Sequence, residues 1–135
     1  MYLLDTDVLS HLVKAAPPAA LLERFSHLRK QDLYTSSVNQ GELLYGLFRL
    51  RKGRTYFQRA ERLWQRLCLL SFDSYSAEIY GQLRAELERR GTPLPDVDLM
   101  IASVALGNAL ILVTGNVRHF SRVPNLQIEN WLRGM

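Results

Sequence analysis

The clearest indication of the architecture is the N-terminal segment Met1-Tyr2-Leu3-Leu4-Asp5-Thr6-Asp7. Its short apolar run, Tyr2 to Leu4, is followed directly by the acidic residue Asp5. Apolar residues then recur at helical spacing, at Val8, Leu9, Leu12 and Val13. The pattern predicts a strand, an acidic turn and a helix. Ligand sites of open α/β sheets lie just outside the carboxyl ends of the strands, and Asp5 falls at such an end.

The Asp5 carboxylate can be interpreted in two ways. Asp5 or Thr6 can cap the following helix, because their oxygens accept hydrogen bonds from the free N–H groups of a first turn. A carboxylate beside a buried sheet also loses much of its water, which is costly unless a cation or a hydrogen-bond donor meets it. We therefore expect a positive group near Asp5.

Length and composition predict one domain that spans residues 1–135. With 135 residues, 47% of them hydrophobic, the chain is long enough for a core without disulfides. Cys68 is the only cysteine, which excludes an intrachain disulfide and a cysteine-rich metal site. No basic segment precedes Lys14, and the apolar runs fall far short of the roughly 20 residues of a membrane span. We expect a cytoplasmic protein with no signal peptide and no membrane contact.

The charge of the chain is weakly suggestive of a nucleic-acid partner. Lysine and arginine number 17 against 13 acids, and all but three of these cations are arginine, whose planar fork suits phosphate. Many basic proteins simply have a solvated cationic face. The arginines of the segment 54–67 fit that simpler interpretation better, because Glu61 lies among them and no aromatic platform is evident.

Three further stretches carry polar residues where an α/β fold would place a site. A helix over about 38–51 carries Glu42 beside its apolar stripe of Leu43, Leu44, Leu47 and Leu50, and Gly46 one turn later suggests a close approach to the backbone. A second helix begins near Asp98 and is apolar on nearly all sides, so it should be buried. Asp96 is expected to cap that helix and to point elsewhere.

The last of these stretches is Thr114-Gly115-Asn116, which follows the uninterrupted apolar run of residues 110–113. Such a run is typical of a central parallel strand. A brief helix over 117–120 and a last edge strand over 126–128 should follow, with Trp131 packing back on the sheet.

Strands that alternate with helices predict a parallel sheet with helices on both faces. In such a sheet Asp5 and Asn116 lie at the same edge, and helices that begin there can bring Glu42 and Asp98 beside them. Three converging carboxylates would repel one another without a cation. Oxygen ligands select Mg²⁺ or Mn²⁺. A zinc site is disfavoured because the three histidines, His11, His27 and His119, show no ligand spacing. An acidic pocket, a hard metal ion and an arginine-rich surface together indicate phosphodiester hydrolysis.

Four separated motifs resemble those of the PIN-domain ribonucleases, and more closely the VapC-type toxins of bacterial toxin–antitoxin pairs. The motifs are Leu4-Asp5-Thr6-Asp7, Gly41-Glu42-Leu43-Leu44-Tyr45-Gly46, Gly91-Thr92-Pro93-Leu94 with Asp98-Leu99-Met100-Ile101-Ala102, and Leu112-Val113-Thr114-Gly115-Asn116-Val117-Arg118-His119-Phe120. The resemblance spans nearly the whole chain. It implies a three-layer α/β/α fold with a parallel sheet of about five strands. It also implies an endoribonuclease dependent on Mg²⁺ or Mn²⁺, a homodimer and a cognate VapB-type antitoxin.

The resemblance also implies roles for individual residues. Asp5, Glu42 and Asp98 fall on the family's three principal acids and are the expected metal ligands. Asn116 falls where a fourth acid often stands, so the chain has one charge fewer there. We therefore hypothesise one tightly held ion, with a second recruited only by substrate phosphate.

Asp7 stands where the family accepts Asn or Ser, and we expect it, with Thr114 and Asp96, to support the ligands from outside. Thr114 is expected to orient a water molecule on the metal. The RNA target stays open between initiator tRNA, ribosomal RNA and mRNA.

Three alternatives compete with this interpretation. Asp5-Thr6-Asp7 after a strand also resembles the first motif of haloacid-dehalogenase-type phosphatases, with Asp5 as nucleophile. That family needs a lysine well downstream, and the last lysine here is Lys52. A receiver domain with Asp73 as phosphoacceptor lacks its late lysine for the same reason. A catalytically silent PIN scaffold is disfavoured because the three principal acids are intact.

Overall fold

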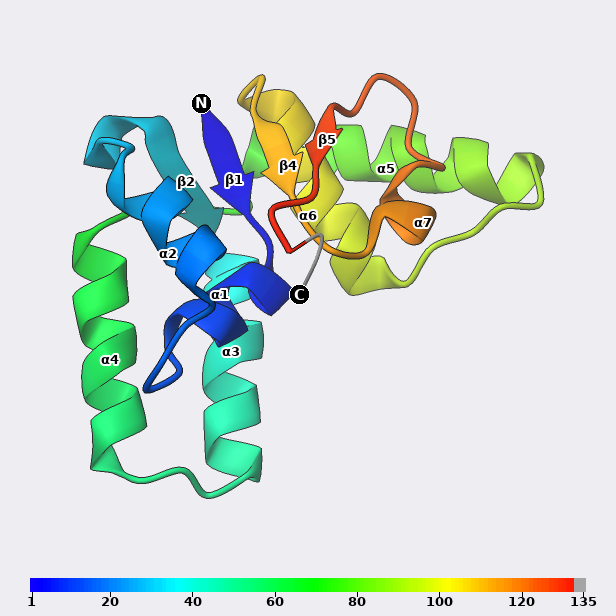
Figure 1. Cartoon of the computed structure of the whole chain (residues 1–135). Helices are drawn as coiled ribbons and strands as arrows, with labels where there is room; N and C mark the ends of the chain where they lie inside the picture. Colours follow the sequence, from blue (N-terminus) through cyan, green and yellow to red (C-terminus); the bar gives the residue numbers. More distant parts are fainter. Residues whose placement is uncertain (133–135) are drawn as a thin grey trace.

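A five-stranded, entirely parallel sheet forms the centre of the computed structural model, which describes residues 1–132 (Figure 1). The strands are β1 (Tyr2–Leu4), β2 (Leu33–Ser36), β3 (Cys68–Leu70), β4 (Ile111–Val113) and β5 (Ile128–Glu129). Their order is β3-β2-β1-β4-β5, and all four pairings are parallel. The N-terminal strand therefore lies at the centre, where the register pairs Leu4 with Val113.

Helices cover both faces of the sheet, which makes the predicted three-layer α/β/α arrangement. The elements are α1 (Thr6–Leu12), α2 (Ala19–Ser26), the 3₁₀ turn η1 (Lys30–Asp32), α3 (Ser37–Arg49), α4 (Arg54–Gln65), α5 (Ser74–Arg89), α6 (Asp96–Gly107) and α7 (Val117–Phe120). Side chains alternate across a strand, so Leu4 joins the core beneath α1 to α4 and Leu3 joins the core beneath α5 to α7. Both leucines are fully buried.

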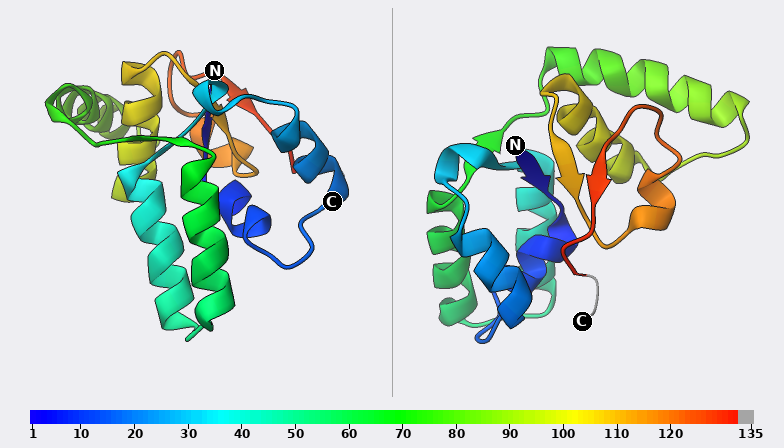
Figure 2. Two further views of the ribbon diagram at one scale, coloured as in Figure 1. Left: turned by 90° about the vertical axis from the view of Figure 1, so that its left-hand side faces the viewer. Right: turned by 45° about the horizontal axis from the view of Figure 1, so that its top comes forward.

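The chain order places the carboxyl ends of β1 and β4 at a topological switch point. The path runs outward from β1 through β2 to β3, then returns to the other side of β1 to form β4 and β5. Crevices form outside the carboxyl ends of two neighbouring strands at such a point. Helices α3 and α4 extend past this end of the sheet (Figures 1 and 2).

Several local predictions are confirmed. Helix α6 buries half of its residues, including the continuous run Ile101–Ala105, in agreement with its apolar sequence. Trp131 is buried and packs edge-on against Tyr2, with ring centroids 5.0 Å apart. None of the helices in the described part of the chain has both the length and the apolar character needed to cross a bilayer.

Other local predictions are wrong in detail. The last strand is Ile128–Glu129, two residues later at its start than predicted, because pairing with Leu112 and Val113 sets its position. Leu50 lies at the end of α3 and is 59% exposed, not buried. Gly46 has no close neighbour, since a Cβ built there would meet nothing within 4 Å.

Candidate active site

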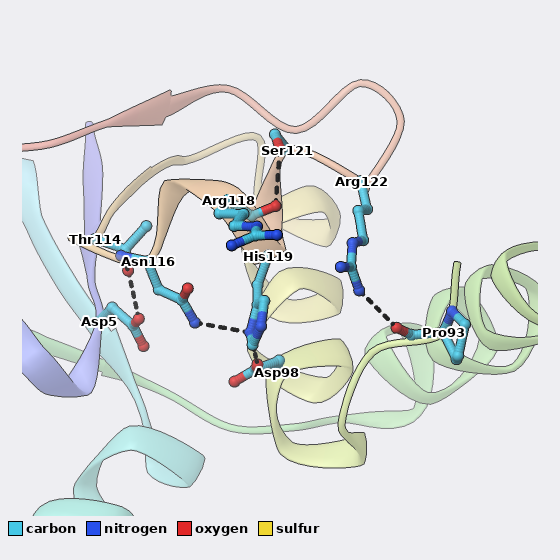
Figure 3. Close-up of polar contacts among 9 residues, drawn as sticks. All are labelled: Asp5, Pro93, Asp98, Thr114, Asn116, Arg118, His119, Ser121 and Arg122. Atoms are coloured by element: carbon cyan, nitrogen blue, oxygen red, sulfur yellow. Dashed lines mark hydrogen bonds and ion pairs between the residues drawn. The ribbon is translucent and has the colours of Figure 1, made fainter. Parts of the chain in front are cut away.

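Asp5 lies at the carboxyl end of β1 with its carboxylate nearly enclosed, only 7% of the residue being exposed. Its Oδ1 accepts hydrogen bonds from the Thr6 N–H (2.8 Å) and the Asn39 amide (3.1 Å). Its Oδ2 accepts from the Thr114 hydroxyl (2.7 Å) (Figure 3). Asp5 is thus the N-cap of α1, as one interpretation predicted, and three donors meet it where a positive group was expected. Both oxygens are held in fixed directions.

Burial raises the pKa of Asp5 to about 6. The nearby charges of Asp7 and Asp98 raise this pKa further, whereas the hydrogen bonds from Thr114 and Thr6 lower it. Loss of water and repulsion between acids were both expected to make the charged form of Asp5 costly. Loss of water contributes more to the raised pKa because the carboxylate is buried between two strand ends. A bound cation would relieve both costs.

Glu42 reaches the same region from α3. The Thr6 hydroxyl donates to Glu42 Oε1 (2.6 Å), and the Asn39 amide donates to Thr6 Oγ1 (3.0 Å). Asn39 itself is fully buried and is fixed by a capping box with Ser36 at the start of α3. One buried amide therefore links the surroundings of Glu42 to the Asp5 carboxylate.

Asp98 lies in the first turn of α6, on the other side of the sheet end. Its Oδ2 is 3.5 Å from His119 Nδ1, and that nitrogen is 3.0 Å from the Asn116 amide nitrogen (Figure 3). Burial raises the pKa of Asp98, and the contact with His119 lowers it. The two contacts compete for one ring nitrogen: a proton on Nδ1 favours Asp98, and a bare Nδ1 favours the Asn116 amide.

Polar contacts join the three acids into one network, with hydrogen bonds between Asp5 and Glu42 and an ion-pair contact at Asp98. The remaining link is the Thr114 hydroxyl, which donates to Asp5 and accepts from the Asn116 N–H (3.0 Å). Over residues 1–132, however, no three His, Cys, Asp or Glu side chains stand close enough together to hold a metal ion. The three carboxylates do not meet in one tight cluster as expected, because polar neutral side chains stand between them.

The two remaining acids differ in their relation to this network. Asp7 Oδ2 accepts from the Gly115 N–H (2.8 Å), so it fastens the start of α1 to the loop after β4. Asp96 does not cap α6, since the N-cap position is Pro95 and no side chain caps that helix. Its carboxylate is exposed and pairs with Arg84 at 3.2 Å, so the expectation that Asp96 supports the site is wrong.

Asn39, Thr6 and His119 are the residues that sequence reasoning missed. Asn39 stands three positions after Ser36, which is a recognisable capping pattern, but nothing in that pattern indicates a contact with Asp5. The spacing of the three histidines shows no metal-ligand pattern, so the sequence indicated no role for His119. Its partner Asp98 is distant in sequence, and only the packing of α7 beside α6 brings the two together.

Comparison with known proteins decides the family. The family model of the PIN domain matches residues 2–126. The tRNA(fMet)-specific endonuclease VapC of Salmonella typhimurium is 36% identical, over 96% of this chain and 97% of its own length. Ribonuclease VapC2 of Rickettsia felis is 31% identical, over 97% of this chain and 98% of its own. The chain belongs to the VapC group of the PIN-domain family.

The fold of this PIN domain agrees with that assignment. The crystal structure of VapBC2 from Rickettsia felis bound to a DNA fragment from their promoter superposes with a TM-score of 0.89. It is 32% identical and covers 96% of this chain and 98% of that one. The resemblance seen in the four motifs is confirmed, and the phosphatase and receiver-domain alternatives are excluded for this PIN domain.

Proposed function

We propose that this PIN domain is a divalent-metal-dependent endoribonuclease and the toxin of a type II toxin–antitoxin pair. One observation carries the proposal: a buried carboxylate, Asp5, lies at the switch point of the sheet between Glu42 and Asp98. Hydrogen bonds through Asn39 and Thr6 link it to Glu42, and polar contacts through Thr114, Asn116 and His119 lead to Asp98. The names of its relatives, which are VapC ribonucleases, support the same activity. Residues 1–135 would act as one nuclease domain.

The residues present fit a hard divalent cation, and we propose Mg²⁺ or Mn²⁺. Asp5 carries a carboxylate that burial makes costly to ionise, and a cation would stabilise its charged form. Asp5 would hold the ion, and the Glu42 and Asp98 carboxylates, which stand apart from it in this structure, would have to move toward Asp5 to complete the ligand set. Oxygen donors of this kind suit these metals. When bound, such an ion neutralises charge on a phosphodiester and lowers the pKa of an attacking water molecule. The single charge missing at Asn116 favours one tightly held ion.

The neighbouring residues would orient the ligands and the substrate. Thr114 and Asn39 hold the two Asp5 oxygens, so the carboxylate needs little rearrangement when it binds. Asp7 keeps the loop carrying Thr114 and Asn116 against the start of α1. The amide of Asn116 can donate a hydrogen bond to a phosphate oxygen, a role that a carboxylate could not take.

The partners follow from the same relatives. We propose an RNA substrate, a cognate VapB-type antitoxin, a homodimer and a cytoplasmic location. A relative named as a tRNA(fMet)-specific endonuclease makes initiator tRNA the first substrate to test. Ribosomal RNA and mRNA are the other candidates, and mapping of RNA 5′ ends after brief expression distinguishes the three.

Two neighbouring acids of α6 provide the test. Asp98→Asn should abolish metal-dependent RNA cleavage, whereas Asp96→Asn should leave it unchanged, since Asp96 pairs with Arg84 outside the network. Cleavage is followed on gels with Mg²⁺, with Mn²⁺ and with EDTA, and folding is checked by circular dichroism. Cleavage that persists in EDTA or in a folded Asp98→Asn variant would contradict the proposal, and no cleavage by the wild type would favour a silent scaffold.

A further inference from the structure

A cavity of about 240 Å³ lies directly beside the proposed active site, between α1, α3 and the start of α4. Glu42 lines one end of this cavity, which we call the Gly46 pocket. The Gly46 pocket continues along α3 past Gly46 to Leu50 and is closed by Lys52 and Tyr56. Since Glu42 belongs both to the acid network and to the pocket wall, whatever fills the pocket lies next to the proposed metal site.

The position of the pocket follows from two helices that run side by side. Thr6 and Ser10 are one turn apart on α1, where the Ser10 hydroxyl donates to the Thr6 carbonyl (2.9 Å). Glu42 and Gly46 are one turn apart on α3. Thr6 contacts Glu42, whereas Ser10 and Gly46 line the pocket. The pocket therefore begins at Glu42 and extends along α3 away from the rest of the acid network.

The walls of the pocket combine an apolar floor with positive charge. Val13, Leu43 and Leu47 are buried side chains of the floor. Lys14 and Lys52 also line the pocket, and they are two of only three lysines in the chain. Within residues 1–132, neither lysine has a carboxylate within ion-pair distance. Lys14 Nζ lies 3.0 Å from His11 Nδ1, and Lys52 Nζ lies over the Tyr56 ring at 4.7 Å from its centre.

Gly46 keeps this space open. Among residues 1–132, a Cβ at this position would meet nothing within 4 Å, so no described side chain packs against it. Glycine is disfavoured in a helix interior relative to alanine, and here neither the backbone conformation nor a close neighbour requires it. A larger side chain could occupy the pocket without disturbing the core.

We propose that the Gly46 pocket binds a nucleoside of the RNA substrate, adjacent to the phosphate that is cleaved. This inference rests on the proposed ribonuclease function. An apolar floor suits the face of a nucleobase, and two ammonium groups without carboxylate partners suit the phosphates that flank it. Charge complementarity and the shared residue Glu42 favour RNA over a protein side chain as the occupant.

Filling the pocket from α3 is the main test. Gly46→Leu should reduce kcat/KM for RNA cleavage by roughly tenfold to a hundredfold, the range expected when one base loses its contact surface. Hydrolysis of bis(p-nitrophenyl) phosphate, which has no nucleoside, and Mn²⁺ binding measured by calorimetry should not change. The matched control is Gly41→Leu, because Gly41 is on the same helix, also has free space around it and does not line the pocket.

Each other outcome overturns the inference in a recognisable way. Unchanged RNA cleavage by folded Gly46→Leu shows that no nucleoside binds there. Loss of both RNA and bis(p-nitrophenyl) phosphate hydrolysis shows that the substitution disturbs Glu42 instead. Normal RNA cleavage with loss of antitoxin binding assigns the pocket to the protein partner. Failure of the wild type to cleave RNA or to bind metal refutes the proposed function itself.

The lysines are tested separately through salt dependence. Lys14→Gln and Lys52→Gln should each weaken the binding of RNA to the folded protein, measured in EDTA. Each should also reduce the slope of log K against log salt by about 0.7, the value for one phosphate contact with a single strand. Lys30→Gln is the control, since the third lysine is exposed in η1, away from the pocket. If the slope of log K against log salt is the same for all three variants, neither Lys14 nor Lys52 contacts a phosphate.

Discussion

Replacement of Asp5 by asparagine should make the metal-free protein more stable at neutral pH while it abolishes catalysis. Burial raises the pKa of Asp5 from 3.8 to about 6. Between these two values the folded state binds more protons than the unfolded state, so the stability contributed by this group falls as the pH rises through the window. Above pH 6 the full penalty of a buried, ionised carboxylate is present.

The size of the effect can be worked out from that pKa. At about 1.36 kcal/mol for each pKa unit, the penalty at pH 7.5 amounts to about 3 kcal/mol. Asparagine keeps the oxygen that accepts from Thr6 and Asn39, but its NH₂ group replaces the oxygen that accepts from Thr114, at a cost of about 1 kcal/mol. The free energy of unfolding should therefore rise by about 2 kcal/mol at pH 7.5. At pH 3.5 the variant should be slightly less stable than the wild type.

The assay is urea unfolding in EDTA at both pH values, followed by circular dichroism, with the difference between variant and wild type as the measured quantity. Addition of Mg²⁺ at a hundred times its dissociation constant should stabilise the wild type by about 2.7 kcal/mol and leave the variant unchanged. A variant that is less stable than the wild type at both pH values would refute the reasoning. So would equal stabilisation of the two proteins by Mg²⁺.

Four further predictions concern the surroundings of Asp5 and the core. Asn39→Leu leaves buried acceptors without their donor, so the free energy of unfolding should fall by about 2 kcal/mol in urea titrations and kcat/KM should fall with it; unchanged kcat/KM would argue against the linking role. His119→Ala removes the contact that lowers the pKa of Asp98, so that pKa should rise and the acid limb of the pH–rate profile should move to higher pH; an unmoved limb would contradict this. Leu112→Ala should cost about 2 to 5 kcal/mol of stability, measured by urea unfolding, because Leu112 is fully buried in the central part of the sheet, and kcat of the folded protein should stay the same. Calorimetric titration with Mn²⁺ in the absence of RNA should give one tight site, and two equally tight sites would rule out the one-ion hypothesis.

The local elements were predictable because their signals are short in range. An apolar run that ends in Asp5, followed by helical periodicity, already predicts β1 and α1. The apolar segment after Asp98 predicts the buried helix α6. Element ends were less predictable. The start of β5 depends on its pairing with Leu112 and Val113, which no local pattern encodes.

The relations among the site residues required the tertiary structure. Asp5 and Asp98 could be named in advance because acids at a strand end and inside an apolar helix are costly without a ligand. Glu42 was named from its place beside an apolar stripe and from the family resemblance. Asp96 and Asp98 look alike in sequence, but packing against α5 gives Asp96 an arginine partner and leaves Asp98 beside His119.

By itself, the sequence determined the parallel α/β architecture, the acids of the candidate site and the motifs that mark the PIN-domain family, since all of these depend on residue type and spacing. The tertiary structure alone decided how those acids are connected and that an open pocket adjoins Glu42. Hydrogen bonds such as that from Thr114 to Asp5 join residues far apart in the chain, and they form only once the register of β1 with β4 has brought the two strand ends together.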